Sequence, residues 1–116
     1  MEQLNRIEVR GNVGSIRLQP VGDRLAARFT VATNYAYKDK DGGAVIETTW
    51  HNVSAWQGKN MIDLHNIQKG SKVYVQGRMH SQKFQGMDGQ DHTVNEIVAR
   101  NIIILDEEVD ALQCEF

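Results

Sequence analysis

The chain has 116 residues, which is enough for one domain with a hydrophobic core and too few for two domains of ordinary size. Its 41% hydrophobic and 24% charged residues exclude a disordered chain. All 13 Lys and Arg lie in residues 1–105 with 10 acidic residues, a net charge of +3, whereas residues 106–116 hold five acids and no base. We expect one folded, mildly basic domain at 1–105 and a short acidic tail at 106–116.

The chain shows no sign of export or membrane insertion. No segment has the roughly 20 consecutive apolar residues of a spanning helix, and the first six residues lack the apolar run of a signal peptide. The single cysteine, Cys114, cannot form an internal disulfide, which is typical of a reducing compartment. We therefore expect a cytoplasmic protein.

The first predicted strand lies near residues 4–18. Its apolar residues keep one parity as far as Val13 and take the other parity from Ile16 onwards. One inserted residue at Gly14-Ser15 would produce that change as a β-bulge, and a bulge bends a strand. The strand is therefore predicted to turn sharply enough to serve two sides of a small barrel.

Period-2 alternation continues along most of the chain and predicts four more strands, at 24–34, 45–56, 72–80, after which the chain passes through Phe84, and from the turn at 87–90 to residue 105. A polar loop with two glycines, 38–43, joins the second and third strands as a hairpin with a mobile tip. The fourth strand is expected to bury Val73, Val75 and Met79.

One short helix is predicted between the third and fourth strands. Met61, Leu64 and Ile67 recur there at helical spacing, Lys69 suits the negative end of the helix dipole, and Gly70 can supply a left-handed cap. Five strands with a helix between the third and fourth are the order of the OB-fold, a Greek-key barrel that binds oligonucleotides. The predicted fold class is all-β.

The third strand carries the most informative side chains. Strand parity places Trp50 and Trp56 on one face with Asn52, and a smaller, more apolar set on the other face. Two exposed rings about 20 Å apart cannot stack on each other, but they suit successive bases of an unpaired nucleic acid. The alternative is that one or both rings cap the barrel or fill an oligomer interface.

Two further groups of aromatic residues lie beside cations. Phe84 follows Lys83 at the end of the fourth strand, and Tyr35 and Tyr37 precede Lys40 in the hairpin. A ring beside an ammonium group can stack on a base and meet its phosphate. Tyrosines at a strand end can equally be plugs of the core.

Five segments resemble, in order and spacing, the bacterial single-stranded DNA-binding protein family: NRIEVRGNVG at 5–14, FTVAT at 29–33, TWH at 49–51, KGSKVYVQG at 69–77 and DGQD at 88–91. The resemblance covers residues 4–105. It implies an OB-fold homotetramer that binds single-stranded DNA without reading its sequence, in replication, recombination and repair.

The resemblance also implies residue roles. The base-stacking positions of the family fall on Tyr37, Trp50, Trp56 and Phe84, and the basic positions that meet the phosphates fall on Lys40, Lys59, Lys69 and Lys83. His51 matches a histidine at the family's subunit interface.

The chain departs from the family pattern in three places. Asn52 stands where well-known members carry a basic residue, and 56–59 holds one residue more than the usual Phe-Gly-Lys. The acidic run follows the barrel without the family's long Gly/Pro/Gln-rich linker. Partner binding through the tail would use Asp106, Glu107, Glu108, Asp110 and Phe116, and a merely solubilising tail is the alternative.

No catalytic, metal or cofactor site is predicted. The four histidines are at least 12 residues apart, no cysteine pair exists, and no phosphate loop or nucleophile motif occurs. An OB-fold nuclease, a primosome-type protein-interaction module and a single-stranded RNA binder are the competing readings, and the exposed tryptophans favour strand binding over the first two.

Overall fold

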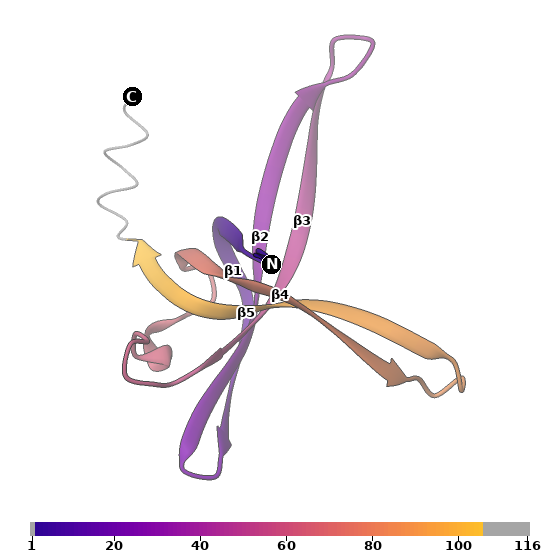
Figure 1. The fold of residues 1–116 in the computed structure, drawn as a ribbon. Coiled ribbons are helices and arrows are strands. Elements are labelled where there is room, and N and C mark those ends of the chain that lie inside the picture. The colour runs from indigo at the N-terminus through magenta and orange to yellow at the C-terminus, as the bar shows by residue number, and fades with distance from the viewer. Residues whose placement is uncertain (1, 106–116) are drawn as a thin grey trace.

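The structure, a computed structural model, describes residues 2–105 and is an all-β barrel. Its strands are β1 (Ile7–Val21), β2 (Arg24–Lys38), β3 (Ala44–Trp56), β4 (Lys72–Gln85) and β5 (Asp91–Leu105), with the 3-10 turn η1 (Leu64–Asn66) between β3 and β4. The strands close in the order β1-β2-β3-β5-β4 (Figure 1). The predicted OB-fold, with five strands and one helical element after the third, is confirmed.

The predicted bulge in β1 is present at Gly14-Ser15. Val13 pairs with Val31 and Ile16 pairs with Phe29, so three steps along β1 oppose two along β2. Before the bulge, β1 also pairs with β4, from Ile7 opposite Gly77 to Asn12 opposite Lys72. The bulge therefore lets one strand border two neighbours and close the barrel.

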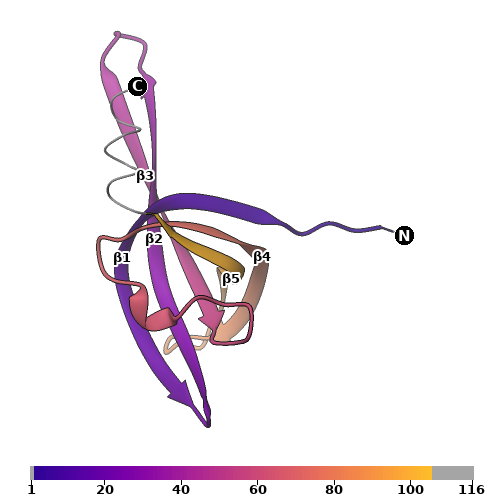
Figure 2. The same ribbon diagram turned by 90° about the vertical axis from the view of Figure 1, so that its left-hand side faces the viewer.

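The predicted helix is a single 3-10 turn, because the side chain of Gln57 hydrogen-bonds backbone groups of this segment. The Gln57 amide donates to the carbonyl oxygen of Ile62 at 2.8 Å, and its carbonyl oxygen accepts from the Leu64 amide at 2.9 Å. Leu64 and Ile67 are 0% and 3% exposed and close one end of the barrel. The turn lies beside the barrel in Figure 2, where it contacts β2. Gly70 has φ 90°, the predicted left-handed conformation.

The core draws one apolar set from all five strands and η1: Val9, Val13, Ala27, Phe29, Val31, Val53, Ala55, Leu64, Ile67, Val73, Val75, Ile97 and Ile102. Val73 and Val75 are buried as predicted. The expected burial of Met79 is wrong, since its side chain is 37% exposed. Met79 has the inward parity and pairs with the buried Ile97 of β5, but β1 pairs with β4 only as far as Gly77, so the Met79 side chain is left uncovered at the edge of the core.

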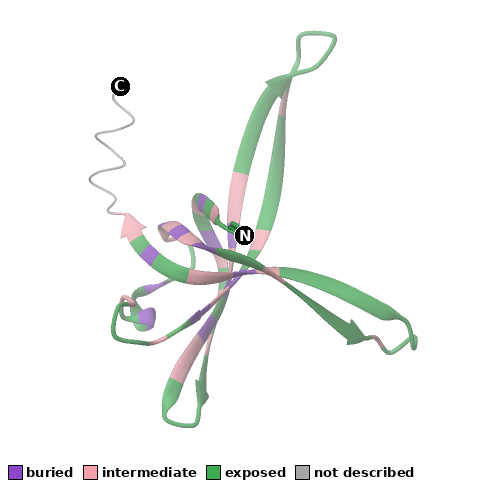
Figure 3. Ribbon diagram, viewed as in Figure 1, coloured by how far each residue is buried: buried purple, intermediate pink, exposed green. Residues whose placement is uncertain are grey.

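Three hairpins radiate from the barrel, and their outer parts are solvent-exposed (Figure 3). The β2–β3 ribbon is longer than predicted, because pairing continues to Lys38 opposite Ala44. Its tip is built on Asp39, whose Oδ1 accepts hydrogen bonds from the amides of Asp41 at 2.9 Å and Gly43 at 2.8 Å. In residues 2–105, no helix is long and apolar enough to cross a bilayer.

Candidate nucleic-acid interface

Trp50 contacts two neighbouring strands. It pairs with Ala32 on β2, and its ring reaches across to Gly14 on β1, where an added Cβ would be 2.9 Å from its Cη2 atom. The bulge under the ring is fixed by Thr30, whose Oγ1 accepts from the Ser15 amide at 3.1 Å. The ring is still 57% exposed, so the sequence prediction of an outward-facing tryptophan is confirmed.

We expect Gly14→Ala to displace this ring, because the new methyl group would occupy the space of Trp50 and of the Thr30 hydroxyl. Overpacking of this kind costs about 1–3 kcal/mol of stability. The measurement is tryptophan emission and thermal unfolding in a Trp56→Phe background, where Trp50 is the remaining tryptophan.

Gly58→Ala is the matched control, because an added Cβ there meets nothing within 4 Å. Equal emission spectra and unfolding midpoints for the two alanine variants would contradict the seating of Trp50 on Gly14.

Trp56 shares the outer face of β3 with Trp50. It pairs with Ala26, six residues from the Trp50–Ala32 pair in the same ladder, and its ring is 41% exposed. The guanidinium carbon of Arg24 lies 5.0 Å from the ring centroid, a cation–π contact that covers part of the ring. A base stacked on Trp56 would therefore have a cation close to its phosphate.

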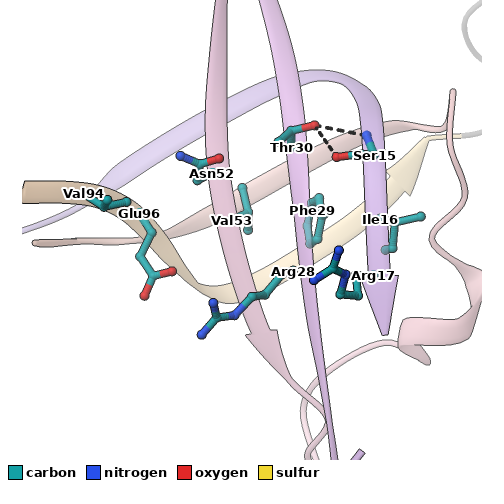
Figure 4. Close-up of a pocket in the computed structure, with 10 residues that line it drawn as sticks. All are labelled: Ser15, Ile16, Arg17, Arg28, Phe29, Thr30, Asn52, Val53, Val94 and Glu96. Atoms are coloured by element: carbon teal, nitrogen blue, oxygen red, sulfur yellow. Dashed lines mark hydrogen bonds between the residues drawn. The ribbon is translucent and has the colours of Figure 1, made fainter. Parts of the chain in front are cut away.

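Between the tryptophans, the structure forms a groove of about 410 Å³ between β1, β2, β3 and the β4–β5 hairpin (Figure 4). Its lining residues are Ser15, Ile16, Arg17, Arg28, Phe29, Thr30, Asn52, Val53, Val94 and Glu96. Thr30 pairs with Asn52, and Arg28 pairs with Ser54, so this hairpin face carries the groove between the two rings. Such a groove suits a segment of polyanion with planar bases.

Sequence reasoning missed Arg17 and Arg28 as candidates. Within residues 2–105, neither guanidinium makes an ion pair, so both are available to a phosphate. The signal was present for Arg28, which has the outward parity of β2. Hairpin register was needed to place it beside Ser54, next to Asn52, where the family expects a basic residue.

Phe84 is 50% exposed near the end of β4, on the outward parity predicted for it. One face of its ring is covered by the imidazole of His92 on β5, with centroids 5.5 Å apart and planes at 28°. Lys83 pairs with Thr93 and therefore projects from the other face of this hairpin. Phe84 and Lys83 are neighbours in sequence but do not share a face.

Tyr37 is 39% exposed and lies against Tyr35, with ring centroids 6.1 Å apart. Tyr37 pairs with Val45, and its odd parity in β2 is that of the inward residues, whereas Trp50 shares the outward face with Ala32. The structure therefore places Tyr37 on the opposite face of the β2–β3 ribbon from the tryptophans. The four predicted stacking residues do not form one flat surface.

The four predicted phosphate contacts are spread around the barrel. Lys40 is at the tip of the β2–β3 hairpin, Lys59 follows β3, Lys69 precedes β4 and Lys83 lies in β4. All four are exposed, and none makes an ion pair with another residue of 2–105. They are free to meet a backbone that passes over several faces.

His51 is partly buried, and its Nε2 atom hydrogen-bonds the Thr33 hydroxyl at 2.9 Å. The role of His51 at a subunit interface stays a prediction. The predicted tail residues, from Asp106 to Phe116, lie outside the described residues.

Elsewhere on the surface, a second groove of about 520 Å³ gathers Arg6, Arg78 and Arg100 from β4, β5 and the segment before β1. Its lining holds no aromatic residue, so it lacks a stacking surface. No group of three or more His, Cys, Asp or Glu within 2–105 could hold a metal ion.

Comparison with known proteins agrees with the fold. Residues 4–105 match the model of the Single-strand binding protein family. The chain is 34% identical over 105 residues to single-stranded DNA-binding proteins of two Neisseria meningitidis strains, covering 88% of this chain and 60% of each relative. For the Xylella fastidiosa protein the identity is 33%, with coverage of 88% and 63%. The chain thus spans about 60% of the length of these relatives.

Solved structures of single-stranded DNA-binding proteins have a similar fold. The Plasmodium falciparum SSB in complex with single-stranded DNA superposes with a TM-score of 0.79 at 30% identity, over 91% of this chain and 98% of that one. The small single-stranded DNA-binding protein of Streptomyces coelicolor, at 23% identity and a TM-score of 0.67, supports the fold. The family model accounts for nearly all of the described residues, and the chain belongs to the single-strand binding protein family.

Proposed function

We propose that this protein binds single-stranded DNA without sequence preference and without catalysing a reaction on it. The observation that carries the proposal is the pair of exposed tryptophans on one face of β3, separated by a groove with two unpaired arginines. Family membership and the DNA-bound structural relative support it. Stacking on a ring is open to every base, which accounts for the absence of sequence preference.

In this proposal the strand crosses the β2–β3 face with bases on Trp50 and Trp56 and its phosphates near Arg17 and Arg28. It continues to Phe84 on the β4–β5 hairpin. Because Tyr37 is on the opposite ribbon face, the strand must pass round an edge of the hairpin to reach it. The DNA is thereby wrapped over the barrel, with Lys40, Lys59, Lys69 and Lys83 as further phosphate partners.

We further propose a cytoplasmic homotetramer with His51 at a subunit interface, acting where DNA is unpaired during replication, recombination and repair. Residues 1–105 form the binding domain. The acidic segment 106–116 would contact replication and repair proteins through Asp106, Glu107, Glu108, Asp110 and Phe116. Sedimentation of the whole chain, with His51→Ala for comparison, tests the assembly.

The test of strand binding is intrinsic tryptophan fluorescence titrated with oligo-dT, oligo-U and duplex DNA of equal length at two salt concentrations. We expect deep quenching by oligo-dT at near-stoichiometric ratios, weaker quenching by oligo-U and little by the duplex. Affinity should fall with salt at about −0.7 log unit per log unit for each phosphate contact. Unchanged fluorescence with all three ligands would favour a protein-interaction module, and tighter binding of oligo-U would favour an RNA binder.

A further inference from the structure

The β4–β5 hairpin tip holds an imidazole against one of the proposed base-stacking rings. His92 stacks on Phe84 at a centroid distance of 5.5 Å, and its Nε2 atom lies 3.2 Å from Oδ1 of Asp88. The other face of the Phe84 ring remains available, since the side chain is 50% exposed. One ring of the pair is thus presented to solvent while the other is tethered to a carboxylate.

The tip is shaped to hold this arrangement. Asp88 also accepts a hydrogen bond from the Gln90 amide at 3.0 Å, and the Gly86 amide donates to the Gln90 carbonyl at 2.9 Å. A Cβ at Gly86 would lie 2.7 Å from two atoms of the imidazole ring, so a larger residue there would push His92 away. The imidazole therefore has a fitted seat between Phe84, Gly86 and Asp88.

Asp88 is the charged group that faces this imidazole. Hydrogen bonds from the Gln90 amide and from His92 hold the pKa of its carboxyl below the usual range, so it remains an anion in mildly acidic solution. Lys83 pairs with Thr93 and Asp91 pairs with Gln85, so both project from the other face of the hairpin. On its own face of the hairpin, His92 has Phe84, Gln82 and Val94 as neighbours, and none of these is charged.

We propose that His92 is a further DNA-contact residue, which positions Phe84 for base stacking and, when protonated, adds a cation beside the stacked nucleotide. This inference rests on the proposed binding of single-stranded DNA. Since the protonated imidazole attracts a phosphate and the neutral one does not, binding takes up a proton. Affinity therefore rises as the pH falls from 8.0 to 5.5.

The test is the affinity for oligo-dT at pH 8.0, 6.5 and 5.5 at constant ionic strength, by anisotropy with a dye that does not titrate in this range. Thymine also has no group that titrates there. We expect the affinity of the wild-type protein to rise about two- to fivefold from pH 8.0 to pH 5.5, the size of one exposed ion pair. His92→Phe keeps a stacked ring without the imidazole nitrogens, so this rise in affinity should be lost.

Two other variants separate stacking from charge. His92→Ala should bind more weakly than wild type already at pH 8.0, because Phe84 loses its neighbouring ring. Asp88→Asn keeps an oxygen for the Gln90 amide but removes the carboxylate that holds the imidazole, so it should bind more weakly than wild type at pH 8.0 as well. The matched control is His65→Phe, which removes the other Asp–His pair, His65 Nδ1 to Asp63 Oδ1 at 2.9 Å, and should behave as wild type.

An unchanged pH dependence in His92→Phe, or wild-type affinity of His92→Ala at pH 8.0, would overturn the inference while leaving DNA binding intact. A wild-type protein that fails to bind oligo-dT at every pH would overturn the proposed function itself.

Discussion

Replacing Trp50 with alanine is expected to weaken binding of oligo-dT by about 5- to 150-fold, because one stacked base contributes about 1–3 kcal/mol. Trp50 is the most exposed of the four proposed stacking rings, and its ring packs against Gly14 of β1. The measurement is the dissociation constant at several salt concentrations. The slope of log affinity against log salt should remain that of the wild-type protein, since no phosphate contact is removed.

Lys83→Gln is expected to change the salt dependence of binding more than the affinity, the opposite of Trp50→Ala. It removes one exposed, unpaired cation and should flatten the salt slope by about 0.7, with only a small loss of affinity at high salt. If Trp50→Ala flattened the slope and Lys83→Gln left it unchanged, the roles assigned to the two side chains would be wrong.

Leu64→Ala is expected to cause the largest loss of stability, about 2–5 kcal/mol, because it empties the space of a fully buried side chain. Leu64 is 0% exposed and closes the end of the barrel from η1, where Gln57 already holds the backbone and prevents collapse into the cavity. Urea unfolding followed by circular dichroism measures the change. DNA affinity of the folded protein should persist, since the Leu64 side chain lies in the core and not on the outer face of β3.

Leu4→Ala makes the same substitution at a position that is 87% exposed, and it should change the midpoint of unfolding very little. A loss below about 1 kcal/mol for Leu64→Ala would mean that the barrel end repacks around the smaller side chain.

The features that sequence predicted best are those fixed by local periodicity. The parity change between Val13 and Ile16 located the bulge, and the alternation through Trp50 and Trp56 gave their exposure. Both follow from the two-residue repeat of a strand, which one sequence displays directly. The family resemblance then supplied the strand-binding role, and the family model confirms that membership over 4–105.

Two predictions failed because a sequence pattern continues beyond the core or the helix that it normally indicates. Met79 continues the inward parity of Val73 and Val75, but β1 no longer pairs with β4 beyond Gly77, so one side of Met79 is left uncovered. Met61, Leu64 and Ile67 have helical spacing, yet hydrogen bonds from Gln57 leave only one 3-10 turn. The burial of a side chain and the hydrogen bonds of a loop backbone depend on contacts between distant parts of the chain. Sequence periodicity carries no information about these contacts.

The candidate site was predicted residue by residue, but its arrangement was not. The resemblance implied that Tyr37 and Trp50 both stack on bases, and the register places them on opposite faces of the ribbon. The stacking of His92 on Phe84 joins two strands through a pairing that only the folded hairpin reveals. These relations require the register, which a single sequence specifies weakly at the exposed ends of strands.

The barrel is closed unevenly, and this has a mechanical consequence. The parallel seam between β3 and β5 consists of the pairs Val53–Ile97 and Ser54–Val98, whereas long antiparallel ladders join β2 to β3 and β4 to β5. A force that spreads the barrel would separate this short seam first, since fewest backbone hydrogen bonds resist it there. Val53 of the seam also lines the groove between the tryptophans. We therefore expect the barrel to open first at the β3–β5 seam, below a bound strand, while the β2–β3 and β4–β5 ladders stay paired.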